Sequence, residues 1–116
     1  MDVIQSYTTE GLFKIAINGD LDASTAFKVD DVIRNAIKKQ EYNILVDCKL
    51  LEYISSAGLG VFISHLDDVT AQKGKLVFFD MNETVYDVFK LLGLHNIFNI
   101  AKSESDAKIL FNINEN

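Results

Sequence analysis

The stretch from residue 43 to residue 60 constrains the fold more than any other part of the chain. Residues 44–48 form an apolar run in which Asp47 alone is polar. A run this apolar suits a strand that is buried on both faces, as in a sheet covered by helices. Ser55 and Ser56 follow, and after them apolar residues recur at helical spacing from 59 to 69. The stretch therefore predicts a buried strand that leads into a helix, the unit from which α/β domains are built.

The same alternation of strand and helix signals recurs along the rest of the chain. Strands are expected at residues 3–7 and 12–17, joined as a hairpin, and Gly19-Asp20-Leu21-Asp22 should end the second of them. Further strands are expected at 76–79 and, as a short apolar segment, at 97–100. Helices should begin where small polar residues can cap them, at Asp22 or Ser24, at Ser55 or Ser56, at Asn82 and at Ser103. They should end near residues 38–40, at Lys73-Gly74, at Gly93 and at Phe111.

These elements predict the order β-β-α-β-α-β-α-β-α. Strands that alternate with helices imply parallel pairs joined by right-handed crossovers, so we expect a small α/β domain with a mixed sheet and about four helices. A single domain should span residues 1–116, because the length and the 48% hydrophobic content are ordinary for one core. Ile63 on the second helix and Leu92 on the third are expected to face that core.

Composition restricts the classes of partner. Cys48 is the only cysteine, so no disulfide can form within one copy and a reduced, intracellular setting is expected. No apolar run approaches the roughly 20 residues of a membrane span, which predicts a cytoplasmic protein without membrane insertion. The net charge of −6 opposes binding to a polyanion, so direct nucleic-acid binding is not expected. The partners should be proteins.

Two features of the second helix admit both a structural and a functional interpretation. A serine at a helix start caps free N–H groups, or it can carry a phosphate there; with two adjacent serines, one can cap while the other stays exposed. Gly60 lies inside the first turns, where glycine costs about 0.5–1 kcal/mol relative to alanine. Gly58 and Gly60 together would let another segment approach the helix backbone closely, either from within the fold or from a partner.

Enzyme motifs are incomplete in this sequence. Residues 56–58 supply half of a G-x-S-x-G nucleophile elbow, and Gly58-Leu59-Gly60 begins a dinucleotide fingerprint whose third glycine is replaced by Ile63. His65 and His95 lack metal-ligand spacing to another histidine or cysteine, so both are expected to be ordinary surface or partly buried side chains. We expect no catalytic residue, no cofactor and no metal.

Three motifs together resemble the STAS domain of bacterial anti-sigma factor antagonists. They are Gly19-Asp20-Leu21-Asp22 with Thr25-Ala26, the run from Tyr53 to Val61 after the apolar strand, and residues 85–94. The resemblance spans nearly the whole chain. It implies a binding module that, when unphosphorylated, binds an anti-sigma factor with a serine-kinase fold and so releases its sigma factor. The anti-sigma factor phosphorylates such antagonists on a serine, and a PP2C-type phosphatase reverses the mark in many of these systems.

The resemblance also assigns residues. The family's usual run is Asp-Ser-Ser/Thr-Gly-Leu-Gly with the first hydroxyl as phosphoacceptor, which implies Ser56 as the acceptor, Ser55 at the acidic position and Ala57 at the second hydroxyl. The partner-binding residues that it implies are Asp22, Ser24, Ser55, Ser56, Gly58, Leu59 and Gly60.

Two other functions remain open at this point. The domain could be a constitutive STAS docking subunit of a lipid-transport or sensory complex, with a permanent docking surface in place of a switch. It could also be a hydrolase that uses Ser56, in which case the purified chain alone would turn over an ester.

Overall fold

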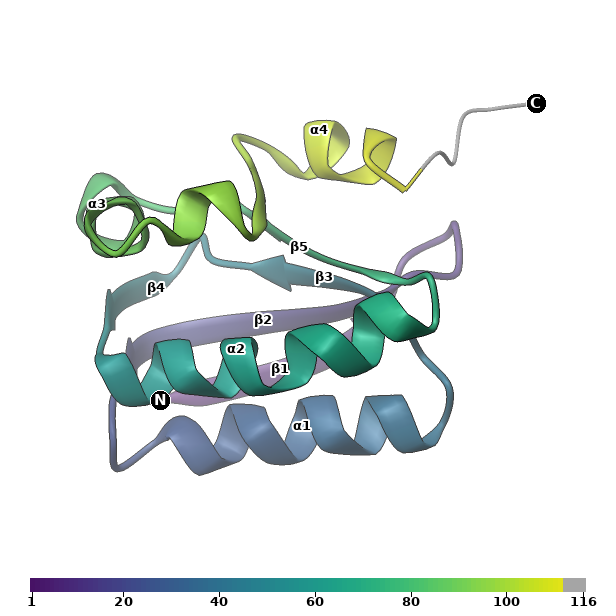
Figure 1. Ribbon diagram of the computed structural model, residues 1–116, viewed down its shortest axis with the longest axis horizontal. Coiled ribbons are helices and arrows are strands. Elements are labelled where there is room, and N and C mark those ends of the chain that lie inside the picture. The colour runs from purple at the N-terminus through teal and green to yellow at the C-terminus, as the bar shows by residue number, and fades with distance from the viewer. Residues whose placement is uncertain (112–116) are drawn as a thin grey trace.

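A computed structural model describes residues 1–111, which form a sheet with helices on both faces (Figure 1). The strands are β1 (Asp2–Tyr7), β2 (Phe13–Leu21), β3 (Asn43–Asp47), β4 (Leu51–Ile54), β5 (Lys75–Phe79) and β6 (Asn99–Ala101). The helices are α1 (Ala26–Lys38), α2 (Ser56–Ala71), α3 (Glu83–Leu91) and α4 (Glu104–Ile109), with a 3-10 turn η1 (Leu94–Asn96) after α3. The α/β class, the hairpin and the mixed sheet are confirmed.

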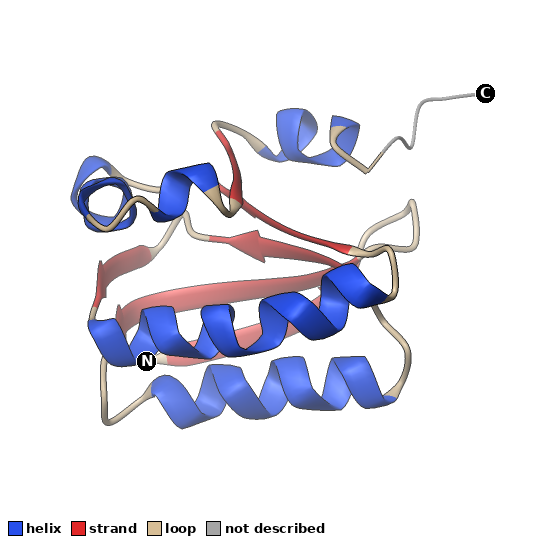
Figure 2. Cartoon of the chain, viewed as in Figure 1, coloured by secondary structure: helices blue, strands red, loops and turns tan. Residues whose placement is uncertain are grey.

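The sheet runs in the order β1-β2-β3-β5-β6, and β4 pairs with the end of β2 beyond the region that pairs with β3 (Figure 2). Only β1 is antiparallel to its neighbour, β2. All other pairs are parallel, as expected for strands joined through helices. Both β3 and β4 therefore run in the same direction as β2, and the chain passes from the end of β4 into α2.

Two sequence predictions about these strands were wrong. The glycine and aspartates at 19–22 do not end the second strand, because β2 continues to Leu21. Gly19 has a φ of +104° and lies where the register of β2 against β4 shifts, so it forms a bulge within the strand. The predicted order also lacked β4, because its four residues are too few to show a strand period.

Helices α1 and α2 lie side by side and cover one face of the sheet, where most of the core is found (Figure 1). Phe13, Ile15 and Ile17 of β2 all point into this core, as their spacing predicted. On the opposite face a smaller cluster of Leu45, Val77 and Phe79 packs beneath Ala107 of α4. The two layers explain why β3 and β5 are apolar on both faces.

The helix ends were predicted with mixed success. Asn82 caps α3 by accepting a hydrogen bond from the Val85 N–H at 2.7 Å, and Gly93 follows the helix with a φ of +73°, both as predicted. Ser103 caps α4, but this helix ends at Ile109 and not at Phe111. Ile63 and Leu92 were wrongly expected to face the core, since their side chains are 48% and 58% exposed.

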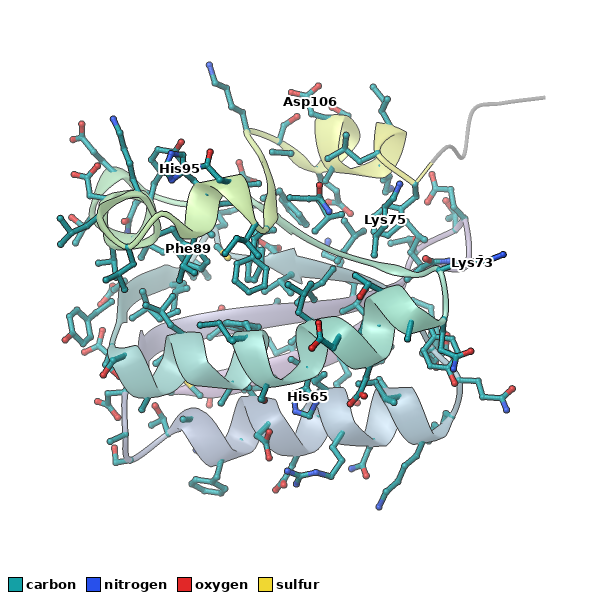
Figure 3. All side chains as sticks on the ribbon, viewed as in Figure 1. His65, Lys73, Lys75, Phe89, His95 and Asp106 are labelled. Atoms are coloured by element: carbon teal, nitrogen blue, oxygen red, sulfur yellow. The ribbon has the colours of Figure 1, made fainter. Side chains whose placement is uncertain are left out.

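His65 ties α2 to α1. Its side chain lies between the two helices (Figure 3), and Nε2 is 2.7 Å from Oδ1 of Asp30, which also forms an ion pair with Arg34. Asp67 and Asp68, which follow it closely in the sequence, are not its partners in the described part of the chain. The contact links the middle of α2 to α1. Within residues 1–111, no helix has the length and apolar character needed to cross a membrane.

Candidate functional site

The start of α2 is held in place by the neighbouring end of β2. Leu21 pairs with Ile54 in parallel register, and the Ser55 N–H donates to the Leu21 carbonyl at 2.9 Å. Asp22 follows Leu21 directly, so the loop that begins at Asp22 leaves the sheet beside the first residues of α2. The two segments meet at one end of the molecule, where α1 and α2 both begin (Figure 1). This arrangement brings together residues that are more than 30 positions apart in the chain.

The two serines at this point have different environments. Ser55 is the N-cap residue of α2: its Oγ accepts from the Gly58 N–H at 3.5 Å and its carbonyl accepts from the Leu59 N–H at 3.0 Å. Ser56 is the first residue of the helix and is exposed. Among residues 1–111, no hydrogen bond uses the Ser56 Oγ. One serine therefore caps the helix and the other presents a hydroxyl to solvent.

Asp22 organises the adjacent loop. Its Oδ1 accepts from the Ser24 N–H at 2.9 Å and from the Ser24 hydroxyl at 2.7 Å, and the Thr25 hydroxyl lies 3.2 Å from the same atom. The Ser24 hydroxyl is the main reason why the pKa of Asp22 lies below its usual value, with the Ser24 N–H next in effect. The carboxylate is thus ionised at neutral pH, on an exposed loop beside Ser56.

The prediction that Asp22 or Ser24 caps α1 was wrong. The N-cap position is Thr25, and its side chain makes no cap bond to the helix. The Thr25 hydroxyl instead donates to the carbonyl of Asp20 at 2.9 Å, across the turn. Asp22 and Ser24 use their side chains within the loop, which is the Asx turn that competes with capping for such residues.

The two glycines of α2 have opposite surroundings. Gly58 is buried, and a Cβ added there would lie 2.7 Å from Cγ of Leu21 and 3.0 Å from Cγ1 of Ile54. Gly60 is exposed, and a Cβ added there would meet no atom within 4 Å. Close packing within the fold therefore explains Gly58 and leaves Gly60 unexplained. The structure also places Leu59 in the core, at 2% exposure, so its side chain is not part of the surface around Ser56.

An exposed strip on α2 continues from Ser56. Gly60 and Ile63 follow at intervals of four and three residues, which places all three on one side of the helix. Two more large apolar side chains are exposed on the adjoining elements: Phe27, the second residue of α1, is 59% exposed, and Tyr53 of β4 is 47% exposed. Sequence analysis assigned no surface role to Phe27 or Tyr53 and expected Ile63 in the core, because its apolar patterns predicted only what faces the core.

The site lacks the parts of a nucleophilic enzyme within the described chain. No hydrogen bond there joins Ser56 Oγ to a histidine or carboxylate that could act as a base. Cys48, the other potential nucleophile, is fully buried, and burial raises the pKa of its thiol, so it stays protonated. Among residues 1–111, no three histidine, cysteine or acidic side chains converge to hold a metal ion. The site presents the exposed hydroxyl of Ser56 at the first residue of α2.

Comparison with known proteins gives a consistent set of relatives. A family model described as the STAS domain matches residues 3–107. The anti-sigma-B factor antagonist of Listeria monocytogenes is 28% identical over 92 residues, which cover 79% of this chain and 81% of that protein. Two solved structures share the fold. An anti-sigma factor antagonist from Mycobacterium paratuberculosis gives a TM-score of 0.83 at 15% identity, covering 96% of this chain and 93% of its own. The Bacillus cell fate determinant SpoIIAA in its phosphorylated form gives a TM-score of 0.72 at 20% identity, covering 94% of this chain and 99% of its own.

The contrast between the two glycines can be measured. Gly58→Ala should lower the free energy of unfolding by about 1–3 kcal/mol, because its methyl group would overlap Leu21. Gly60→Ala should leave it unchanged or raise it by up to about 1 kcal/mol, because alanine favours the helix and its methyl group has open space. Urea denaturation of both variants checks this. Equal losses in the two would contradict the packing described for Gly58.

The different environments of Ser55 and Ser56 predict that their alanine variants differ in stability. Ser55→Ala should lower the free energy of unfolding by about 1 kcal/mol, because the first turn of α2 loses its cap. Ser56→Ala should change it by less than about 0.5 kcal/mol, since the hydroxyl is exposed. The same denaturation experiment compares them, and a larger loss in Ser56→Ala would show that Ser56 is the structural residue.

Proposed function

The chain belongs to the STAS domain family, and from that premise we propose that it is an anti-sigma factor antagonist controlled by phosphorylation of Ser56. In its unphosphorylated form it binds, in the cytoplasm, an anti-sigma factor with a serine-kinase fold and so releases the sigma factor held by that protein. Phosphorylation of Ser56 by the anti-sigma factor ends the binding. A PP2C-type phosphatase removes the phosphate. The domain is a binding module and performs no chemistry of its own.

One observation carries this proposal: Ser56 is exposed at the first residue of α2, while the capping of the helix is left to Ser55. A hydroxyl that the fold does not need is free for modification. The relatives point the same way, since the Listeria protein is named an anti-sigma-B factor antagonist and SpoIIAA has been solved in a phosphorylated form. The partner surface would comprise Asp22, Ser24, Ser55, Ser56 and Gly60.

The two departures from the family's usual run fit this arrangement. Ser55 stands where the family has an acid, and in this structure it is the N-cap residue of α2. Serine and aspartate are about equally good N-caps, so the replacement keeps the helix start intact. Ala57 replaces the second hydroxyl, which leaves Ser56 as the exposed hydroxyl in the first turn. The departures therefore leave the proposed acceptor in place.

The switch follows from the charge that a phosphate brings. Phosphoserine adds about −1.5 to −2 charges at pH 7. A partner that covers Ser56 would have to desolvate this charge, next to the ionised Asp22, at a cost of several kcal/mol. A loss of about 3–4 kcal/mol weakens a complex several-hundredfold, since each 1.4 kcal/mol is about tenfold. Neither protein has to refold for the complex to dissociate.

The free protein tolerates the phosphate for the same structural reason that makes Ser56 accessible. The first N–H groups of a helix have no partners inside the helix and carry partial positive charge, so a dianion at the first residue is favourably placed. The open space at Gly60, one turn further along, leaves room for a kinase or a phosphatase to approach the hydroxyl. Phosphorylation should thus act on binding and leave folding intact.

The proposal predicts how serine variants behave with a purified anti-sigma factor of the serine-kinase fold from the same organism. Ser56→Ala should bind as the natural chain does and take up no phosphate from ATP. Ser55→Ala should still be phosphorylated, since it loses only a cap. Ser56→Asp should bind at least about tenfold more weakly, because it places a charge at the interface. Calorimetry measures the binding and intact-mass spectrometry measures the phosphate.

Two outcomes of this experiment would count against the proposal. Phosphate uptake by Ser56→Ala equal to that of the natural chain would remove Ser56 as the acceptor. Equal affinity of Ser56→Asp and Ser56→Ala would show that charge at this position does not control the complex, as expected of a constitutive docking subunit.

A further inference from the structure

A second potential site lies outside the carboxyl ends of β5 and β6, away from Ser56. Here the structure contains a cavity of about 460 Å³, within the roughly 300–1,000 Å³ typical of small-molecule pockets. Met81 comes two residues after β5, and Lys102 comes directly after β6. These strands are adjacent and parallel, and ligands of open α/β sheets bind in the crevice beyond such strand ends. The cavity thus occupies the position where this architecture takes up ligands.

The lining of the cavity combines an apolar part with two opposite charges. Met81, Ile100 and Ala101 supply apolar surface, and Tyr86 of α3 adds an aromatic ring. Glu83 lies on the α3 side, and Lys102 lies on the side of the connection from β6 to α4. Among residues 1–111, neither Glu83 nor Lys102 forms an ion pair, although seven such contacts occur elsewhere in this part of the chain. Each charge is therefore available to a ligand.

We propose that this cavity binds a small zwitterion of the amino-acid type with an apolar side chain. The ligand's carboxylate would pair with Lys102 and its ammonium group with Glu83, while its side chain would rest on Ile100 and the Tyr86 ring. A simple anion would leave Glu83 unmatched, and a simple cation would leave Lys102 unmatched. A ligand that carries both charges can make both contacts, and hydrogen bonds between ionised groups are the strong ones.

The cavity is also connected to the strand that leads to Ser56. Asn82, which lines it, caps α3 with its Oδ1, and its Nδ2 donates to the carbonyl of Leu51 in β4 at 3.1 Å. The residues that line the cavity nevertheless all lie outside α2 and outside the loop at 22–25. The proposal for this cavity therefore stands independently of the proposed function at Ser56.

The test is an NMR titration of the full ¹⁵N-labelled chain with L-phenylalanine. Two analogues, each lacking one charge, serve as matched comparisons: 3-phenylpropionate lacks the ammonium group and phenethylamine lacks the carboxylate. L-Phenylalanine should produce saturable shifts at the amides of Glu83, Tyr86 and Lys102. Each analogue should bind at least about tenfold more weakly, because one charge-assisted contact is lost.

Variants provide the control within the chain. Lys102→Gln and Glu83→Gln, both at exposed positions, should each weaken the binding of L-phenylalanine about tenfold or more. Lys90 lies on α3, as Glu83 does, but does not line the cavity, so Lys90→Gln should leave the binding unchanged. The remaining amide signals report that each variant is folded. The proposal is overturned if L-phenylalanine gives no saturable shifts, if either analogue binds as tightly, or if Lys90→Gln weakens binding as much as Lys102→Gln.

Discussion

The parallel pairing of β2 with β4 is the constraint on which the start of α2 depends. It joins the Leu21 carbonyl to the Ser55 N–H at 2.9 Å and seats Gly58 against Leu21 so closely that a methyl group does not fit. The loop at Asp22 and the serines at 55 and 56 are thereby brought to one end of the molecule. Without this pairing, a helix could still form, but its first turn would have no fixed position beside the loop.

Under the proposed function, the first turns of α2 place residues that stabilise the fold next to residues that would take part in the switch. Ser55 satisfies a free N–H group of the helix and Gly58 permits the close packing, so both serve the fold. Ser56 and Gly60 lie in the same turns, yet the described structure gives neither of them a packing or capping role. A site whose exposed residues are not needed for folding can be modified and covered repeatedly without loss of the native state.

Sequence analysis predicted most of the fold because the apolar residues form clear patterns, a continuous run in residues 44–48 and a helical period along α1. It missed β4 and the continuation of β2, since a four-residue strand gives little period and Gly19 signals a break where the structure has a bulge. The serines were identified from sequence, but their separate roles required the position of the Gly58 N–H. The contacts of His65 with Asp30 and of Gly58 with Leu21 join distant segments, so no local pattern could predict them.

The measurement that tests the central claim most directly is intact-mass spectrometry with fragment mapping of the protein isolated from its native cells during growth and under starvation. The account predicts a single phosphate on Ser56, with an occupancy that differs between the two conditions, while Ser55 remains unmodified. A chain that carries no phosphate in either condition, or that carries it on another residue, would contradict the assignment of Ser56 as the switch.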